Sequence, residues 1–158
     1  VADVVHMYDF EGPTPQRAVQ MQCEMDGDCP LILGDAMQLR QVIHNLIQNA
    51  LDACEMKGEE ALPSVTVRTQ WLESVRRVRL TVLDAGPGFS DMLLKRVFEP
   101  YVTTKEKGTG LGLAVVKKIA EEHGAQIDLG NRVVDGVIMG AQVSLSFNIQ
   151  ETQTEAVP

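Results

Sequence analysis

The sequence predicts one globular domain that contains both helices and strands. Three observations support this prediction. The chain has 158 residues, of which 44% are hydrophobic and 23% charged, a composition typical of a water-soluble domain with one core. Apolar residues recur at helical spacing in residues 35–56 and 109–123. Between and after these segments, apolar and polar residues alternate as they do in half-buried strands.

The first half of the chain is predicted to contain strands on both sides of one long helix. Residues 19–25 alternate as a strand does, and the short apolar run 31–33 predicts a second strand that ends at Gly34. Asp35 is a suitable N-cap, and helical spacing continues to about Met56, before Gly58. Residues 65–71 and 78–82 then predict two strands that are separated by a turn around Ser74.

The second half begins with a glycine-rich stretch, residues 86–112, in which only residues 91–97 show a short helical pattern. Long irregular connections inside compact domains are usually functional or disordered. A helix is predicted from Thr109 to about His123, with Gly124 as its stop signal. Apolar residues at 127–129 and 143–147 predict the last two strands.

Composition excludes several classes of protein. A formal net charge of −8 disfavours a surface dedicated to nucleic acid, because phosphate binding needs concentrated Lys and Arg. No apolar stretch approaches the roughly 18–20 residues of a membrane helix. The three cysteines form no CxxC pair, which favours a reducing cytoplasm over a disulfide framework or a zinc site.

Asp84 stands at the end of a predicted strand, on the face that points toward the core. Alternation places it on the same side as Leu80 and Val82. A buried carboxylate needs a hydrogen-bonding partner, and in an empty domain that partner can be a ligand. The alternative is a strand end at solvent, where the carboxylate caps the turn at Ala85-Gly86.

Three polar residues of the long helix, Asn45, Asn49 and Asp52, project within an arc of about 60° beside its apolar stripe. Carboxamide oxygens suit the Mg²⁺ of a nucleotide, which takes one or two protein oxygens and fills its shell with water and phosphate oxygens. The alternative is a solvated helix face, since the neighbours His44 and Gln48 are polar too.

A glycine-rich run, residues 108–113, leads directly into the second helix. Glycine lets backbone N–H groups approach a phosphate, and a helix N-terminus adds unpaired donors and partial positive charge. No strand leads into these glycines, no GxxxxGK[ST] motif is present, and the HRD and DFG motifs of protein kinases are missing. The run predicts either an anion site of another type or a tight connection.

These motifs occur in a distinctive order: Asn-x-x-x-Asn on a helix, Asp-x-Gly-x-Gly-Phe after a strand, and Gly-x-Gly-Leu-Gly-Leu before a second helix. In this combination the sequence resembles the GHKL (Bergerat-fold) ATP-binding superfamily, and most closely the catalytic ATP-binding domain of bacterial sensor histidine kinases. The matching segments are residues 45–53, 84–89, 98–105 and 108–113. The lid with Thr103-Thr104-Lys105 is similar to that of the nitrogen-regulation type.

The resemblance implies an α+β fold, a two-layer α/β sandwich whose mixed, mostly antiparallel sheet is covered on one face by helices. It implies that Asp84 accepts a hydrogen bond from the adenine amino group of ATP and that Asn49 binds Mg²⁺. Asn45 would lie close to the phosphates and, with Lys105, act in catalysis. The other implied cofactor-binding residues are Asp52, Gly86, Gly88, Phe98, Thr104, Gly108, Thr109, Gly110, Leu111, Gly112 and Leu113.

Two departures from the family pattern change what is expected of the site. Many sensor kinases have a basic residue where this chain has Asp52, so phosphate binding is expected to depend more on Lys105 or Lys107. Gly140-Ala141 stands where relatives often have Gly-Thr, so a hydroxyl near the adenine is expected to be absent.

The activity implied by the resemblance is transfer of the γ-phosphoryl group of Mg-ATP to a histidine on a separate dimerisation domain, and then to an aspartate of a response regulator. His6, His44 and His123 lie in no phosphoacceptor motif, so the acceptor is expected outside this chain. The implied partners are that dimerisation domain and the response regulator, in a homodimeric full-length protein. Neither nucleic acid nor direct membrane contact by this domain is expected.

The implied location is the cytoplasm, whether or not the parent protein is anchored in the inner membrane. Residues 1–15 are expected to be the end of a helix or linker from a dimerisation domain, residues 16–150 the ATP-binding catalytic domain, and residues 151–158 a disordered tail.

Two alternative functions stay open. One is an ATPase of the gyrase, Hsp90 or mismatch-repair type, although its hydrolytic members carry Glu where Asn45 stands, and a carboxamide cannot act as a general base. The other is a nucleotide-binding module without transfer activity.

Overall fold

The computed structural model describes residues 20–57, 64–100 and 112–149. The predicted linker at 1–15 and the predicted tail at 151–158 lie outside these residues. The described elements are β1 (Gln20–Glu24), α2 (Ala36–Met56), β2 (Ser64–Leu72), the 3₁₀ turn η1 (Glu73–Val75), β3 (Arg77–Asp84), α3 (Asp91–Arg96), α4 (Gly112–Glu122), β4 (Gln126–Val134) and β5 (Val137–Asn148).

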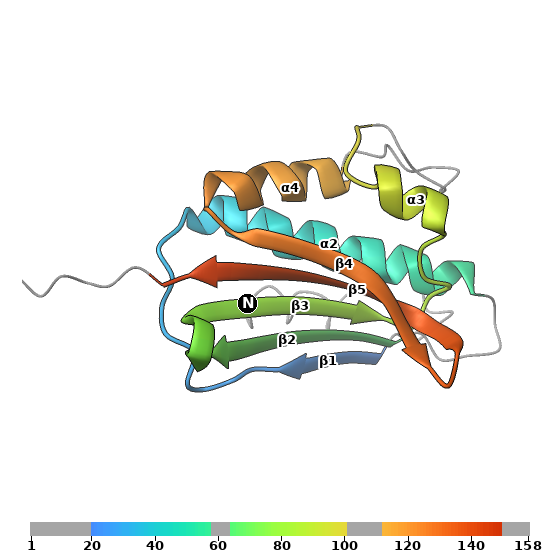
Figure 1. The fold of residues 1–158 in the computed structure, drawn as a ribbon, viewed down its shortest axis with the longest axis horizontal. Helices are drawn as coiled ribbons and strands as arrows, with labels where there is room; N and C mark the ends of the chain where they lie inside the picture. Colours follow the sequence, from blue (N-terminus) through green and yellow to red (C-terminus); the bar gives the residue numbers. More distant parts are fainter. Residues whose placement is uncertain (1–19, 58–63, 101–111, 150–158) are drawn as a thin grey trace, which may run out of the picture.

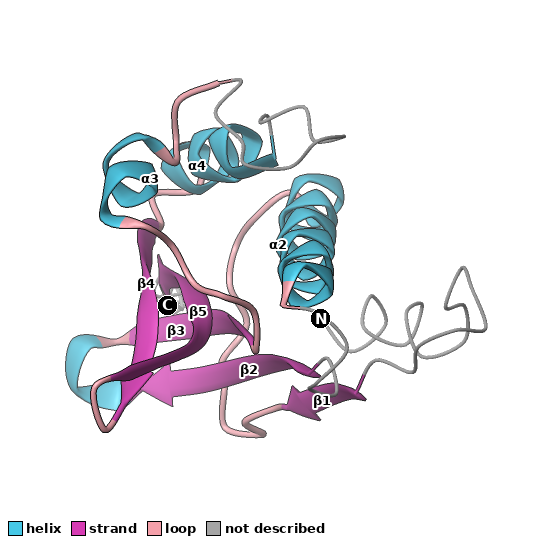
Figure 2. Cartoon of the chain, turned by 90° about the vertical axis from the view of Figure 1, so that its right-hand side faces the viewer, coloured by secondary structure: helices cyan, strands magenta, loops and turns pink. Residues whose placement is uncertain are grey.

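The five described strands form one twisted sheet in the order β1-β2-β3-β5-β4 (Figure 1). β1 runs parallel to β2, and the other neighbouring strands are antiparallel. α2 packs against β2 and β3, α4 packs against α2 and β4, and both helices lie on the same face of the sheet (Figure 2). The predicted α+β sandwich, with a mixed, mostly antiparallel sheet covered on one face, is therefore confirmed.

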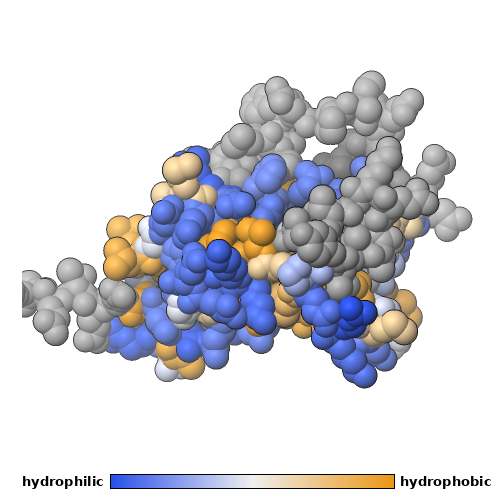
Figure 3. Space-filling view, turned by 90° about the horizontal axis from the view of Figure 1, so that it is seen from above, coloured by the Kyte–Doolittle hydropathy of each residue, from blue (hydrophilic) through white to orange (hydrophobic). Residues whose placement is uncertain are grey.

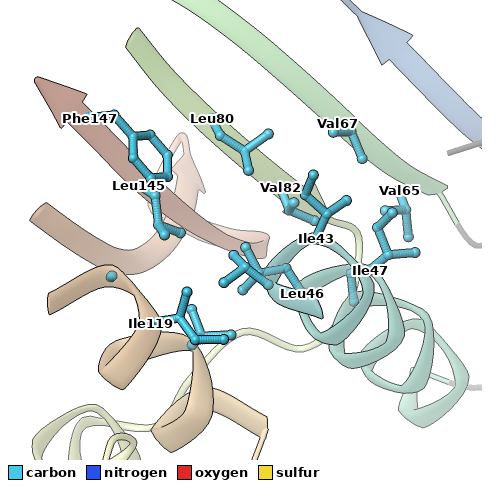
Figure 4. Packing of buried hydrophobic residues seen from close by; sticks show 14 of the residues in the cluster. Ile43, Leu46, Ile47, Val65, Val67, Leu80, Val82, Ile119, Leu145 and Phe147 are labelled. Carbon is cyan, nitrogen blue, oxygen red and sulfur yellow. The ribbon is translucent and has the colours of Figure 1, made fainter. Parts of the chain in front are cut away.

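The hydrophobic core lies between the two long helices and the inner face of the sheet (Figure 4). Every second residue of the inner strands points toward the helices, as the strand period requires. Burial of one such aliphatic side chain contributes about 1.5–3 kcal/mol. This packing sets the rotation of α2, so its polar residues Asn45, Asn49 and Asp52 are partly buried beside the apolar stripe. The labelled core residues are Ile43, Leu46, Ile47, Val65, Val67, Leu80, Val82, Ile119, Leu145 and Phe147.

The start of α2 is fixed by its cap and by a histidine. Asp35 Oδ1 accepts hydrogen bonds from Met37 N (2.8 Å) and Gln38 N (3.0 Å), so the predicted N-cap is confirmed. The backbone N–H of Asp35 donates to His123 Nε2 (3.0 Å), while His123 Nδ1 lies 2.8 Å from the Ile119 carbonyl oxygen. His123 therefore joins the end of α4 to the start of α2.

The strand predicted at residues 31–33 is wrong. This segment pairs with none of the described strands, and Leu31 and Leu33 are 96% and 74% exposed. β1 already occupies the edge of the sheet beside β2. Only Ile32 packs against the core, and the segment serves as a loop into the cap of α2.

The last two strands are longer than their predicted apolar cores and meet in a hairpin. Its turn is Asp135-Gly136, both with positive φ (49° and 78°), as a type I′ turn requires. The end of the hairpin carries exposed apolar side chains, so no alternation of polar and apolar residues reveals the strands there. These side chains are Val133, Val134, Val137, Ile138 and Met139.

The surface over the helices is mostly hydrophilic where the described residues are visible (Figure 3). None of the described helices combines the length and the apolar character that a membrane span requires.

Candidate functional site

Asp84 ends β3 and is buried, with 8% of its surface exposed. Its carboxylate oxygen Oδ1 accepts backbone hydrogen bonds from Gly86 N (2.8 Å) and Ala141 N (3.1 Å). The inward orientation predicted from strand alternation is therefore confirmed. The bond from Gly86 also caps the turn after the strand, so the capping that the alternative interpretation invoked is present as well, although the carboxylate is not at solvent.

Burial is the dominant influence on this carboxylate and raises the pKa of Asp84, because desolvation penalises the charged form. The N–H groups of Ala141 and Gly86 and the positive charges of Arg132 and Lys57 lower the pKa, but by less. A charged Asp84 therefore costs folding free energy at neutral pH. A ligand that donates a hydrogen bond to it would offset part of that cost.

The turn after Asp84 lies directly on α2. A Cβ atom at Gly86 would be 2.8 Å from both the Cβ atom and the carbonyl oxygen of Ala53, so only glycine allows this approach. One helical turn earlier, a Cβ atom at Gly112 would be 3.4 Å from Asn49 Nδ2. Asn49 and Ala53 are four residues apart, or about 6 Å along the helix axis. The Asp84 turn and the start of α4 therefore meet the same face of α2.

The polar seam predicted on α2 is present. Asn45, Asn49 and Asp52 are partly buried, whereas His44 and Gln48 are exposed. Asp52 Oδ1 accepts a hydrogen bond from Gln48 Nε2 (2.8 Å). The seam thus lies beside the core and is not part of the solvated face of the helix, and its middle residue, Asn49, lies beside the start of α4.

The start of α4 has the properties of an anion site. Its first turn carries no acidic residue, and its first backbone N–H groups have no partner within the helix. Leu113 packs against the core and holds this end of the helix in place. The other predicted phosphate and lid residues, Thr104, Lys105, Gly108, Thr109, Gly110 and Leu111, lie outside the described residues, so their roles stay predictions.

Phe98 follows α3 and is partly buried. The ammonium group of Lys117, on α4, lies 5.4 Å from the centre of the Phe98 ring, within the range of a cation–π interaction. Val97 beside it is buried. The Lys117 contact attaches the end of the described segment 84–100 to α4, and the predicted role of Phe98 in cofactor binding stays a prediction.

Two residues of β4 that the sequence interpretation missed contact the end of β3 and the segment after it. Arg132 Nη1 donates to the Asp84 carbonyl oxygen (3.0 Å), and the Asn131 side chain bonds the backbone of Phe89. Both partners are more than 40 residues away, so no local pattern identifies them. The Asp135-Gly136 dipeptide is the available signal, because it predicts the hairpin that brings Asn131 opposite Ala141.

Gly140 and Ala141 of β5 close the site from the side of the sheet. Gly140 has a φ of +151°, and a Cβ atom there would overlap the Asp84 carbonyl oxygen. Ala141 contributes its backbone N–H to the Asp84 carboxylate and has no hydroxyl, as the sequence indicates. The carboxylate is therefore held from both β5 and its own turn.

Comparison with known proteins identifies a family and several similar sensor histidine kinases. Residues 34–151 match the sequence model of the family described as "Histidine kinase-, DNA gyrase B-, and HSP90-like ATPase". An NtrY-like sensor histidine kinase of Rickettsia bellii is 38% identical over 74% of this chain and 18% of its own length. The sensor histidine kinase ZraS of Escherichia coli K12 is 39% identical over 73% of this chain and 23% of its own length. The chain thus matches about a fifth of the length of these relatives.

Solved structures share the fold. The nucleotide-free catalytic domain of the histidine kinase ThkA is 27% identical, with a TM-score of 0.75, over 94% of this chain and 91% of that chain. Full-length ShkA, solved in complex with AMPPNP, is 26% identical, with a TM-score of 0.72, over 92% of this chain and 28% of that chain. ThkA has also been solved in complex with the response regulator protein TrrA, with a TM-score of 0.65 and 24% identity over 84% of this chain and 34% of that chain.

Proposed function

The chain belongs to the family of histidine kinase-, DNA gyrase B- and HSP90-like ATPases, as the ATP-binding domain of a sensor histidine kinase, and we propose that it transfers the γ-phosphoryl group of Mg-ATP to a histidine on a separate dimerisation domain. One observation carries the proposal. The buried Asp84 turn and the start of α4 contact α2 one helical turn apart, at Ala53 and Asn49. One ATP molecule can therefore place its adenine at Asp84 and its phosphates at the start of α4.

At the purine end, Asp84 accepts a hydrogen bond from the adenine amino group. Its buried carboxylate is held by Gly86 and Ala141, so it needs little reorganisation when the base binds. The close packing of Gly86 on Ala53 brings the backbone of the turn near α2 and shapes the space for a flat base. Gly88 completes this turn.

At the phosphate end, the backbone N–H groups that open α4 and the glycines of residues 108–112 bind the phosphates. The Asn49 carboxamide, which lies beside Gly112, supplies an oxygen to Mg²⁺. A single amide oxygen next to a phosphate site fits this ion, which usually takes one or two protein ligands. When bound, Mg²⁺ neutralises charge on the phosphates during transfer.

Asn45 lies one turn before Asn49 and orients the γ-phosphate, and Thr104 and Lys105 contact the triphosphate from the lid. Neither Asn45 nor any neighbour of it on the α2 seam has to remove a proton from water in this scheme. Phosphoryl transfer depends mainly on positioning and charge stabilisation, so a domain without a general base can catalyse it once a nucleophile is presented. The Asn45 carboxamide is the feature that favours transfer over hydrolysis.

The partners of the reaction are the dimerisation domain that carries the histidine and a response regulator that receives the phosphoryl group, with the full-length protein acting as a homodimer in the cytoplasm. The complex of ThkA with TrrA supports the second partner. Residues 16–150 form the catalytic unit in this proposal.

The test is transfer in trans. The chain is mixed with γ-labelled Mg-ATP and the dimerisation domain of its own full-length protein, and phosphohistidine is measured together with free phosphate. We expect acid-labile label on the dimerisation domain and little free phosphate. ATP binding without any transfer would favour a binding module. Steady phosphate release that disappears in Asn45→Ala would favour an ATPase.

A further inference from the structure

The segment from Asp84 to Phe89 is held between two different parts of the fold. On one side, Gly86 lies against Ala53 of α2. On the other side, a Cβ atom at Gly88 would be 2.7 Å from both Asn131 Oδ1 and Ile138 Cγ2, in the β4–β5 hairpin. Gly88 also has a φ of +79°, which favours glycine. The hairpin therefore sets the shape of this segment as much as the helix does.

Asn131 makes the most specific contact in this arrangement. Its Oδ1 accepts a hydrogen bond from Phe89 N (2.6 Å), and its Nδ2 donates to the Phe89 carbonyl oxygen (2.8 Å). A carboxamide offers a donor and an acceptor side by side in one plane, as the N–H and carbonyl groups of Phe89 require. Both bonds are partly buried, so loss of either leaves a backbone group poorly satisfied.

The neighbouring residue holds the other end of the same segment. Arg132 Nη1 donates to the Asp84 carbonyl oxygen (3.0 Å). Asn131 and Arg132 are successive residues of β4, and together they hold both ends of residues 84–89. The β4–β5 register shift lies just beyond them, and its additional residue, Met139, is on β5.

The position of Phe89 also determines where the next element begins. Ser90 follows it directly and caps α3, accepting a hydrogen bond from Leu93 N (3.2 Å). Through Phe89, Asn131 is thus connected to the glycine turn on one side and to the start of α3 on the other.

We propose that Asn131 is a positioning residue of the nucleotide site, which holds residues 84–89 in the conformation that binds the adenine ring. This inference rests on the proposed function. Without the two Phe89 bonds, the glycine turn samples other conformations, since Gly86 and Gly88 have the freest backbones in the segment. Ordering the turn then becomes a cost of binding, which lowers the affinity for ATP.

The experiment compares Asn131→Ala with Asn148→Ala. Asn148 is an exposed residue at the end of β5, so it controls for loss of an asparagine from the same sheet. Affinity for Mg-ATP and binding stoichiometry are measured by calorimetry, at least about 15 °C below the melting temperature of each variant. Exchange of the Phe89 amide proton is followed by NMR without nucleotide.

We expect Asn131→Ala to bind Mg-ATP at least tenfold more weakly at unchanged stoichiometry, with faster exchange at Phe89, and Asn148→Ala to stay within twofold of the original protein. A purely structural role would lower the melting temperature and leave the affinity of the folded molecules unchanged. If Asn131→Ala does not fold, Asn131→Asp replaces it. This variant keeps the size and an acceptor but loses the donor to Phe89, and a fivefold or greater loss of affinity is expected.

Affinity within twofold of the original protein in a folded Asn131 variant would overturn this inference alone. Failure of the original protein to bind Mg-ATP would overturn the proposed function, and the inference with it.

Discussion

Asp26 and Asp84 lie at opposite ends of β2 and use their carboxylates in the same way. Asp84 is paired with Val65 near the start of β2, and Asp26 lies beside Trp71 near its end. Each carboxylate accepts two backbone hydrogen bonds, between 2.8 and 3.1 Å long. Yet the pKa of Asp26 is lowered and the pKa of Asp84 is raised.

The difference in pKa comes from burial. At Asp26, which is partly exposed, the hydrogen bonds from Trp71 and Asp28 favour the charged form and dominate. At Asp84, desolvation dominates. The first carboxylate therefore stabilises the fold when charged, whereas the second costs folding free energy. A charge kept where it weakens the fold is typical of a functional site, and Asp84 is the one that lies at the proposed ATP site.

The largest effect is expected for Gly140→Ala, which tests how tightly the Asp84 end of the sheet is packed. The new Cβ atom would overlap the Asp84 carbonyl oxygen at a φ that disfavours side chains. We expect the free energy of unfolding to fall by about 3 kcal/mol or more, measured by denaturant titration. The matched control is Gly130→Ala on β4, where a Cβ atom meets nothing within 4 Å. Equal stability of the two variants would show that the Asp84 end has room to adjust.

The next effect concerns binding. Asp84→Asn replaces the charged acceptor with a carboxamide that presents an N–H group on one side. We expect Mg-ATP to bind about 1–3 kcal/mol more weakly, or roughly 5- to 150-fold, by calorimetry. The control is Asp26→Asn, which lies at the far end of β2 and should leave the affinity unchanged. An Asp84→Asn variant with the original affinity would contradict the adenine assignment.

A substitution of Asn49, on α2, tests the proposed Mg²⁺ ligand. Asn49→Ala should weaken nucleotide binding by about 1 kcal/mol when Mg²⁺ is present and leave binding in a chelator unchanged, because the amide oxygen acts through the metal. Gln48→Ala is the matched control, one residue away on the exposed side of the helix. Equal losses with and without Mg²⁺ would rule out a metal ligand at this position.

The smallest effects are expected in the pH dependence of stability without nucleotide. The folded-state pKa of Asp26 lies below its ordinary value of 3.8, so its contribution to stability is present above that pH and is lost as the pH falls further. Asp26→Asn should therefore melt at a lower temperature at pH 7, and the difference should shrink toward pH 3.

The contribution of Asp84 to stability depends on pH in the opposite direction. Its folded-state pKa lies above 3.8, so its favourable contribution is present below that pH and is lost as the pH rises through the folded-state value. Asp84→Asn should melt at or above the temperature of the original protein at pH 7, and the advantage should shrink toward pH 3. Melting curves of both variants from pH 3 to pH 7 check the two signs. If the melting temperatures of the two variants, relative to the original protein, change with pH in the same direction, the proposed difference between the two carboxylates is wrong.

Much of the fold follows from local patterns. The Asp35 cap and the helical spacing locate α2 to within a residue, and alternation gives the inward face of β3. The strand expected at 31–33 is wrong because three apolar residues do not specify a pairing partner, and the sheet edge beside β2 is occupied by β1. The outer part of the final hairpin was missed because its exposed valines follow no alternation.

The residues of the candidate site also fall into two groups, those that local patterns predict and those that they do not. Asp84 and the seam of Asn45, Asn49 and Asp52 could be predicted, since strand and helix periods place them locally. Asn131 and Arg132 could not, because their contacts join residues 42 and 48 positions apart and depend on the pairing of β4 with β5. Long-range contacts of this kind appear only when the strands are paired.

A crystal structure of the chain with Mg²⁺ and a non-hydrolysable ATP analogue would test the proposed site most directly. We expect the adenine amino group to lie within hydrogen-bonding distance of the Asp84 carboxylate, and the Asn49 side-chain oxygen to lie about 2.0–2.1 Å from the metal. A bound analogue whose base and metal contact neither residue would contradict the proposed site.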